Sequence, residues 1–450
     1  MTNARRLQVA SLLCFFSCAL FAQTARPKPA AVANQPAPPV ALRGGKLLTI
    51  TRGVIENGTL VMQDGKITAA GPASSVSIPR GARVIDVTGM TIYPGLIDSE
   101  THVGLLEIDQ DKATNDTVET SDEIMPHMHV YDAFHAESEV IPVTRYNGVT
   151  NVIVVPASKD SVPGQDTFVQ LDGRSADEML LVRDIALAVN FIPDVRRNDS
   201  FETAKFPMTR MGVAAQLRQA FLDAQDYARK WRDYEEKKGK KSGDGSDKDK
   251  KDEPPKTDLK LAALVPYVEG KKPVVLAAEQ PSDVQVALRL AREFNLKIVL
   301  NRLVHAGTIV DQVAAAKVPV IVGPIYDTPK EDARYDEVFK LPAELQQRGV
   351  KIAFASYDTH QSRNLPYAAG YAVAYGLPYE EALKAITLNP AEIWGIADRY
   401  GSLDVGKIAN VVVANGDPLD VKTDVKQVFI AGREIPMENR QTKLRDQYSK

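Results

Sequence analysis

Short apolar runs recur along the middle of the chain. They are rich in β-branched residues, contain few polar positions and lie at residues 148–156, 272–279, 296–301, 318–323 and 350–356. Runs of this kind are typical of strands that are buried on both faces of a parallel sheet. Amphipathic helical patterns lie between several of them, over residues 281–295, 308–317 and 342–349.

This alternation of strands and helices favours a (β/α)8 barrel, which is an α/β fold. A doubly wound parallel sheet is the alternative, but no G-x-G-x-x-G segment follows a strand. Ser282 or Asp283 can cap the helix at 281–295. Two β-rich ends flank the middle region, and Asp64-Gly65 between two apolar runs predicts a hairpin in the first of them.

One segment departs from the alternation. Residues 211–241 have the pattern of a long amphipathic helix, and residues 242–258 continue with alternating charges, Gly and Pro. A segment of that composition cannot bury enough apolar surface to become ordered. We therefore expect a disordered charged insert at 240–258, on the surface of the barrel. A partner-binding segment is the other interpretation.

The N-terminus has the pattern of an exported protein. Arg5 and Arg6 precede an apolar run from Leu12 to Phe21, which is too short to span a bilayer. We expect a signal peptide at 1–22, followed by a Pro-rich linker at 23–40. These features predict a periplasmic or extracellular location.

Composition narrows the classes of function. Cys14 and Cys18 are the two cysteines of the chain and fall inside the expected signal peptide, so the mature protein would have no disulfide, thiolate ligand or cysteine nucleophile. The formal net charge of −3 gives no electrostatic footprint for nucleic acid or an anionic membrane. No G-x-S-x-G segment is present, which argues against a serine hydrolase.

Several separated motifs resemble one family. "PGLIDSETH" (94–102) is similar to the strand-1 motif of the amidohydrolase superfamily, which usually reads P-G-[LF]-I-D-x-H-x-H. Residues 385–413 resemble the C-terminal signature of its cyclic-amidohydrolase branch. Residues 206–221 and 362–383 look like those of imidazolonepropionase-related members. The resemblance implies an amidohydrolase-like barrel at 91–399.

The resemblance also implies a second domain and a chemistry. Residues 41–90 and 400–436 would form a small composite β-sandwich from both chain ends. In the family, the barrel holds one or two divalent metals such as zinc or manganese, and a metal-bound water attacks a carbon–nitrogen bond. The ligands are an H-x-H pair after strand 1, Lys or Glu after strand 4, His after strands 5 and 6, and Asp after strand 8.

The sequence departs from the family at these ligands. Glu100 stands in place of the first His of the pair, and only His102 remains. Ala277 occupies the strand-5 position and cannot bind a metal. The strand-6 position falls near Asn301 or Arg302. His305 lies close by, in the following loop or helix.

The strand-8 Asp aligns with Tyr357, or with Asp358 if the turn is shifted by one residue. Glu100 and His102 could hold a single metal ion with help from His360 or Asp358. Without metal, Glu100 and Asp358 would serve as an acid/base pair. A plain ion pair of Glu100 with His102 is the competing interpretation, and such a carboxylate would raise the pKa of His102.

Two further groups are candidates for binding. Arg210 and the Arg363-Asn364 pair lie in family-like motifs, where Arg could hold a substrate carboxylate through two hydrogen bonds or could fix a loop through backbone carbonyls. His127, His129 and His135 lie close together in the connection after the first barrel strand. A replacement metal site is one interpretation, but loop histidines are usually solvated or bonded to backbone, so the cluster is a weak candidate for metal ligands.

Two functions follow from these observations. The first is an exported hydrolase that cleaves carbon–nitrogen bonds of a small, non-peptide or cyclic amide, with an impaired or mononuclear metal site. The second is a catalytically inactive member that binds a solute or serves as partner of an active homologue. We adopt the hydrolase. Homo-oligomerisation, or hetero-oligomerisation with a homologue, is implied by the resemblance alone.

Overall fold

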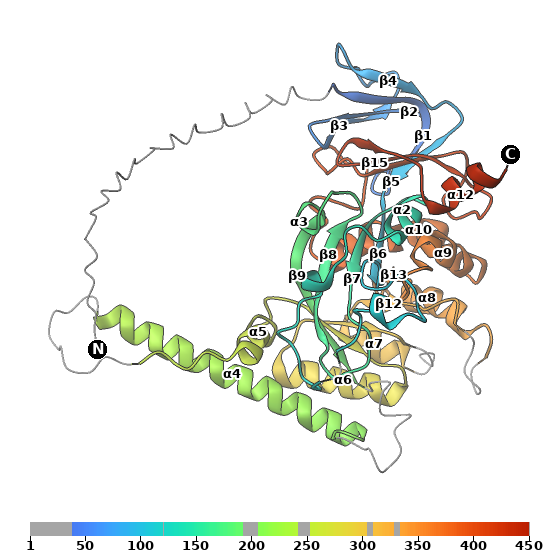
Figure 1. Cartoon of the computed structure of the whole chain (residues 1–450). Coiled ribbons are helices and arrows are strands. Elements are labelled where there is room, and N and C mark those ends of the chain that lie inside the picture. Colours follow the sequence, from blue (N-terminus) through green and yellow to red (C-terminus); the bar gives the residue numbers. More distant parts are fainter. Residues whose placement is uncertain are drawn as a thin grey trace, which may run out of the picture. The chain divides into compact units, whose positions relative to one another are not determined.

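Eight strands form one sheet (Figure 1). Along the chain they are β6 (Leu96–Thr101), β7 (Val149–Val154), β8 (Gly164–Gln170), β9 (Leu180–Asn190), β10 (Val274–Ala277), β11 (Ile298–Asn301), β12 (Val320–Val322) and β13 (Ile352–Phe354). Neighbours in sequence are neighbours in the sheet. After β13, the backbone N–H of Tyr357 donates to the carbonyl of Glu100 on β6 at 2.9 Å. This contact brings the two edges together, so the sheet is a nearly closed barrel, as predicted.

The computed structural model describes residues 38–119, 121–191, 206–241, 253–303, 309–327 and 334–449. The expected signal peptide at 1–22 and residues 23–37 of the linker lie outside the described residues. So do residues 242–252 of the charged insert and His305. None of the helices in the described part of the chain is both long enough and apolar enough to cross a membrane.

Strand β8 interrupts the parallel order of the barrel. It pairs antiparallel with both β7 and β9, whereas all the other neighbours pair parallel. Only residues 155–163 connect β7 to β8, and only 171–179 connect β8 to β9. A parallel crossover needs a dozen or more residues, so these short connections return the chain antiparallel. The beginning of β8 therefore lies at the edge where its neighbours end.

The barrel interior is filled by alternate residues of the strands. One buried cluster contains Ile153, Phe168, Val275 and Val299, together with Tyr357. Residues two apart on a strand share a face, so this cluster identifies which side chains of each strand point inward. The opposite faces belong to a larger cluster that joins the strands to the surrounding helices.

Helices cover the outside of the barrel. They include α6 (Pro281–Phe294), α7 (Val310–Ala316), α8 (Glu337–Gln347), α9 (Leu365–Ala374), α10 (Tyr379–Ala385) and α11 (Leu388–Ile393). The N-cap of α6 is Gln280, not Ser282 or Asp283 as expected. Asp283 lies at the third helical position and accepts from the Gln280 N–H, which closes a capping box. Helix α8 begins before its expected start, and Pro342 lies inside it.

The long predicted helix is present as α4 (Arg210–Lys241), and α5 (Leu259–Val268) packs against it (Figure 1). Asp258 caps α5 by accepting from the Leu261 N–H. The short elements are η1 (Lys112–Thr114), α1 (Val130–Ala133), α2 (Val140–Arg145), α3 (Ala176–Met179), η4 (Ser362–Asn364) and the C-terminal α12 (Arg440–Tyr448).

A second sheet is built from both ends of the described chain, as expected. Its strands are β1 (Val40–Leu48), β2 (Val54–Gln63), β3 (Lys66–Pro72), β4 (Arg83–Asp86), β5 (Thr91–Pro94), β14 (Val411–Ala414), β15 (Val425–Ile430) and β16 (Arg433–Ile435). Antiparallel pairing of β5 with β14 joins the early and late strands, blue and red in Figure 1. The predicted hairpin is confirmed, since Asp64 and Gly65 connect β2 to β3 with positive φ angles.

Candidate active site in the barrel interior

Polar side chains gather inside the barrel at the carboxyl ends of the parallel strands. Asn301 follows the interior residue Val299 by two positions on β11, and Asp166 precedes the interior residue Phe168 by two positions on β8. The antiparallel direction of β8 brings Asp166 to this same edge. Glu100, near the end of β6, reaches across to Asn301. In barrels of this kind the carboxyl edge carries the chemistry.

Glu100 is the centre of this group. Its side chain is almost fully buried, and Asn301 Nδ2 donates to its Oε2 at 2.5 Å. Arg302 Nη2 lies 3.8 Å from its Oε1. Burial raises the pKa of Glu100 to about 7, although the Arg302 cation and the Asn301 hydrogen bond act in the opposite direction. The carboxyl group is thus able to take up or release a proton near neutral pH.

Arg302 is held in an unusual conformation. Its φ angle is 58°, in the left-handed region that non-glycine residues seldom adopt. The guanidinium lies over the ring of Tyr357, 4.7 Å from the centroid, which favours the cation. Tyr357 in turn donates from its hydroxyl to the Ile321 carbonyl at 3.0 Å. Backbone strain of this kind is common at functional sites.

Several atoms around Glu100 have no partner. Asn301 Oδ1, Arg302 Nε and Asp166 Oδ1 are buried and make no hydrogen bond among the described residues. Buried polar atoms in native proteins are nearly always paired. Arg302 Nε is an N–H donor, and the other two atoms are oxygens. Asn301 lies on β11, Arg302 directly follows it, and Asp166 lies on β8.

His102 is half-buried and neutral. Its Nδ1 lies 2.8 Å from the Val155 carbonyl, so this nitrogen carries the proton and donates. Burial lowers the pKa of His102 to about 4. The hydrogen bond to Val155 opposes this effect, the Arg302 cation adds to it, and Asp358 opposes it slightly. The expected rise in the pKa of His102 from a paired Glu100 is therefore wrong, because Glu100 faces Asn301 and Arg302 instead.

Asp98 connects the first and last strands of the barrel through hydrogen bonds. Its Oδ2 accepts from the hydroxyls of Ser356 at 2.6 Å and Ser362 at 2.7 Å, and its Oδ1 accepts from the Ser356 N–H at 3.0 Å. Burial raises its pKa to about 6, and these hydrogen bonds oppose the rise. Asp98 thus links β6 to the segment after β13 and so positions Glu100.

The donor set does not fit a metal ion. No group of three His, Cys, Asp or Glu side chains in the described part of the chain could hold one. Glu100, His102 and His360 therefore do not form a metal-holding group. His360 is exposed, with Nε2 3.9 Å from Asp109 Oδ1. The two carboxylate oxygens of Glu100 face the Asn301 amide and the Arg302 cation.

The other residues predicted for the site, Asp358 and Arg210, lie in two different parts of the structure. Asp358 is half-buried, and its Oδ1 accepts from the Gln361 N–H at 2.7 Å. It lies close enough to His102 to affect the pKa of that residue. Arg210, at the start of α4, donates from Nε to the buried Asp283 at 2.6 Å. This contact is an ion pair with a side chain of α6, whereas the loop-fixing interpretation expects contacts with backbone carbonyls.

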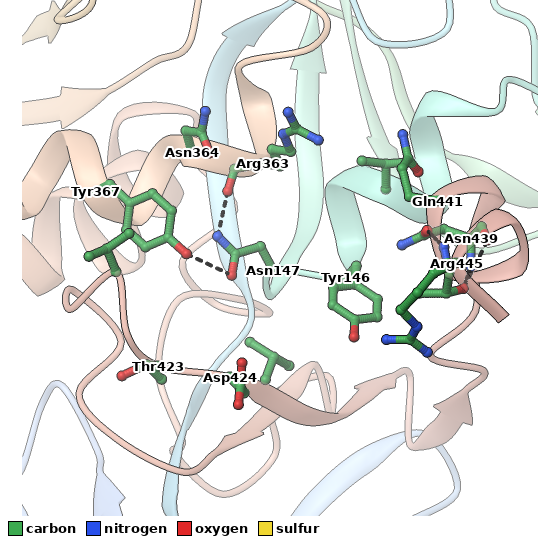
Figure 2. Close-up of a pocket in the computed structure, with 14 residues that line it drawn as sticks. Tyr146, Asn147, Arg363, Asn364, Tyr367, Thr423, Asp424, Asn439, Gln441 and Arg445 are labelled. Atoms are coloured by element: carbon green, nitrogen blue, oxygen red, sulfur yellow. Dashed lines mark hydrogen bonds between the residues drawn. The ribbon is translucent and has the colours of Figure 1, made fainter. Parts of the chain in front are cut away.

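Arg363 and Asn364 line a separate pocket of about 500 Å³ (Figure 2). The pocket lies between the end of α2, the start of α9, residues 421–425 and α12. Figure 2 shows Asn147 between these elements, where it donates to the Arg363 carbonyl at 2.6 Å. None of the polar residues of the barrel interior lines this pocket.

The loop histidines do not converge. His129 Nδ1 lies 2.7 Å from Asp184 Oδ1, and His135 Nδ1 lies 3.9 Å from Glu107 Oε1. In the described part of the chain they belong to no group of three metal-binding side chains. Sequence reasoning did not identify Asp166, because Gly164, Gln165 and Asp166 have the composition of a loop. Its signal was a carboxylate two positions before the apolar pair Phe168-Val169.

A model of the amidohydrolase family matches residues 278–435. Among curated proteins, amidohydrolase tasK from Hapsidospora irregularis is 26% identical over 395 residues, covering 84% of this chain and 39% of tasK. The chain thus spans about two fifths of the length of that relative. An imidazolonepropionase from Rhizobium rhizogenes is 43% identical over 51 residues, 11% of this chain and 12% of that protein.

Solved structures share the architecture. An amidohydrolase from Thermotoga maritima MSB8 has a TM-score of 0.77 and 29% identity, covering 89% of this chain and 100% of that one. Phenylurea hydrolase B has a TM-score of 0.55 at 17% identity, covering 89% of this chain and 97% of that one, and shows the fold alone.

Proposed function

We propose that the chain is a member of the amidohydrolase superfamily and that it hydrolyses a carbon–nitrogen bond of a small amide or cyclic amide. One observation carries this proposal: the unpaired polar atoms around Glu100 complement an amide group. Arg302 Nε–H can donate to an amide oxygen, and Asn301 Oδ1 can accept from an amide N–H. Imidazolonepropionases, to which part of the chain is similar, are named for such a cyclic substrate.

Glu100 acts as the general base. Its carboxylate takes a proton from a water molecule while the water oxygen attacks the amide carbon. A pKa of about 7 gives Glu100 both a substantial ionised fraction and useful basicity at neutral pH. The fixed cation of Arg302 stabilises the negative charge that develops on the amide oxygen. Loss of one such donor typically costs about 10²–10³-fold in rate.

No step of this proposal passes through a metal ion, because the described donor set does not fit one. Metal content of the purified protein tests this part directly. Stoichiometric zinc or manganese that disappears in Glu100→Ala would contradict the proposal. We also retain the prediction that residues 1–22 direct export to the periplasm or exterior, which N-terminal sequencing of protein secreted by the producing cell would test.

The activity itself is tested with a panel of small amides, lactams and imidazolones, by following release of amine or opening of the ring. We expect turnover by the wild type and a loss of about 10²–10⁴-fold in Glu100→Gln. Glu434→Gln is the matched control, since Glu434 pairs with Arg83 in the second sheet, far along the chain from the barrel strands. Equal rates for Glu100→Gln and the wild type would refute the role of Glu100, and an inactive wild type would refute the hydrolase.

A further inference from the structure

Asp166 is a second carboxyl group in the barrel interior. It is 1% exposed, and its Oδ1 makes no hydrogen bond in the described part of the chain. Its position on β8 brings it to the same edge of the barrel as Glu100. A buried acid with a purely structural role would be expected to find hydrogen-bond partners. The unpaired oxygen therefore indicates a group that meets a substrate.

The surroundings of Asp166 differ from those of Glu100. Asp166 has no positively charged neighbour among the described groups that affect its pKa, whereas Glu100 has Arg302. The titratable groups that face it are Glu100 from β6 and Tyr267 from α5, and Tyr267 donates its hydroxyl to Gln165 at 2.5 Å. Burial, with the nearby Glu100 carboxylate, raises the pKa of Asp166 well above its usual value. These surroundings thus favour the protonated form of Asp166.

We infer that Asp166 is the general acid of the reaction, which gives its proton to the leaving nitrogen. The inference rests on the proposed function. It is carried by the position of the two carboxyl groups at one edge of the barrel, in unequal surroundings. Paired carboxyl groups whose environments separate their affinities for protons commonly divide the roles of acid and base.

The proton balance of the reaction is complete with these two groups. Water adds its oxygen to the amide carbon, and Glu100 takes one proton from it. The carbon–nitrogen bond then breaks, and its electron pair stays on nitrogen while Asp166 supplies the proton that makes the departing group a neutral amine. Glu100 is now protonated and Asp166 ionised. Transfer of one proton between them, directly or through water, restores the starting state.

A comparison of leaving groups tests the inference. The probes are an alkyl amide and a p-nitrophenyl ester that carry the same acyl group, because the phenolate departs without a proton. In Asp166→Asn we expect a loss of about 10²–10⁴-fold on the amide and a loss of less than about tenfold on the ester. Equal losses on both probes would assign Asp166 a structural role and overturn the inference, although the proposed hydrolase would stand. An inactive wild type would overturn both.

A spectroscopic readout does not depend on turnover. At about pH 8.5, above the pKa of about 7 of Glu100, infrared difference spectra should show the carbonyl stretch of a protonated carboxylic acid, because the role of general acid requires Asp166 to hold its proton while Glu100 is ionised. The band should disappear in Asp166→Asn. It should persist in Asp336→Asn, since Asp336 is also buried but is paired with Arg334 and Lys340 and stays ionised. Absence of the band in the wild type would overturn the inference.

Discussion

Replacing Glu100 by Gln should stabilise the fold at alkaline pH while it removes activity. The pKa of Glu100 rises from 4.5 to about 7 in the fold, and one pKa unit corresponds to about 1.4 kcal/mol. The folded state therefore holds this proton more tightly than the unfolded chain. The resulting stabilisation is fully present below pH 4.5 and is lost as pH rises through about 7. The loss amounts to about 3 kcal/mol of unfolding free energy.

Gln has the size of Glu and can accept the hydrogen bond from Asn301, but it cannot ionise. The free energy of unfolding of Glu100→Gln, relative to the wild type, should therefore increase by about 3 kcal/mol between about pH 4 and about pH 9. Urea unfolding at both pH values measures this difference, with the fluorescence of Trp394 reporting on the barrel core to which it belongs.

Asp336→Asn is a control variant in which stability should depend on pH in the opposite direction. Hydrogen bonds and charges of Arg334 and Lys340 lower the pKa of Asp336 to about 2, so its ionised form is favoured in the fold. This variant should be less stable than the wild type at neutral pH, and the deficit should shrink as pH falls through about 2. The result that would refute the reasoning is a difference in unfolding free energy between Glu100→Gln and the wild type that stays constant from acid to alkaline pH. In that case burial would not raise the pKa of Glu100.

Two further predictions concern the walls of the site. Gly323→Ala should lower the melting temperature and reduce the free energy of unfolding by about 1–3 kcal/mol. The reason is that Gly323 has a φ of 128° and an added Cβ would lie 2.7 Å from the Ala355 carbonyl oxygen. Gly81→Ala is the control and should reduce the free energy of unfolding less, because an added Cβ there has nothing within 4 Å. The ring of His102 should stay neutral down to about pH 5, because burial lowers its pKa to about 4. The nitrogen-15 NMR shifts of the ring measure its protonation, and a titration midpoint near 6.5 would contradict this prediction.

The parallel strands of the barrel could be predicted because their sequences are nearly continuous apolar runs. Residues 274–277 and 298–301 lie inside two of the expected strands, since burial on both faces leaves no polar alternation. Strand β8 was missed for the opposite reason. Gln165 and Asp166 are polar and fully buried, so the segment has the composition of a loop although it lies inside the barrel.

The candidate site was predictable in part. Alignment of the strand-1 motif marked Glu100, and the strand-6 position marked Asn301 and Arg302. Sequence could not show that these three side chains meet, because β6 and β11 lie on different sides of the barrel and the contact depends on the positive φ of Arg302 and the stacking on Tyr357. Arg363 and Asn364 line the outer pocket for a similar reason: a family-like motif fixes the chain path but not the direction of a side chain.

The second sheet has a consequence for how the chain folds during synthesis. Strand β5 pairs with β14, and about 320 residues separate them along the chain. At a synthesis rate of about 5–20 residues per second, β5 waits roughly 15–60 s for this partner to be made. During that interval the apolar face formed by Leu42, Leu60 and Ile92 lacks its late-arriving neighbours Val411 and Phe429. The first strands of the nascent chain therefore carry an unpaired apolar surface during synthesis, and chaperone binding there would protect it from aggregation.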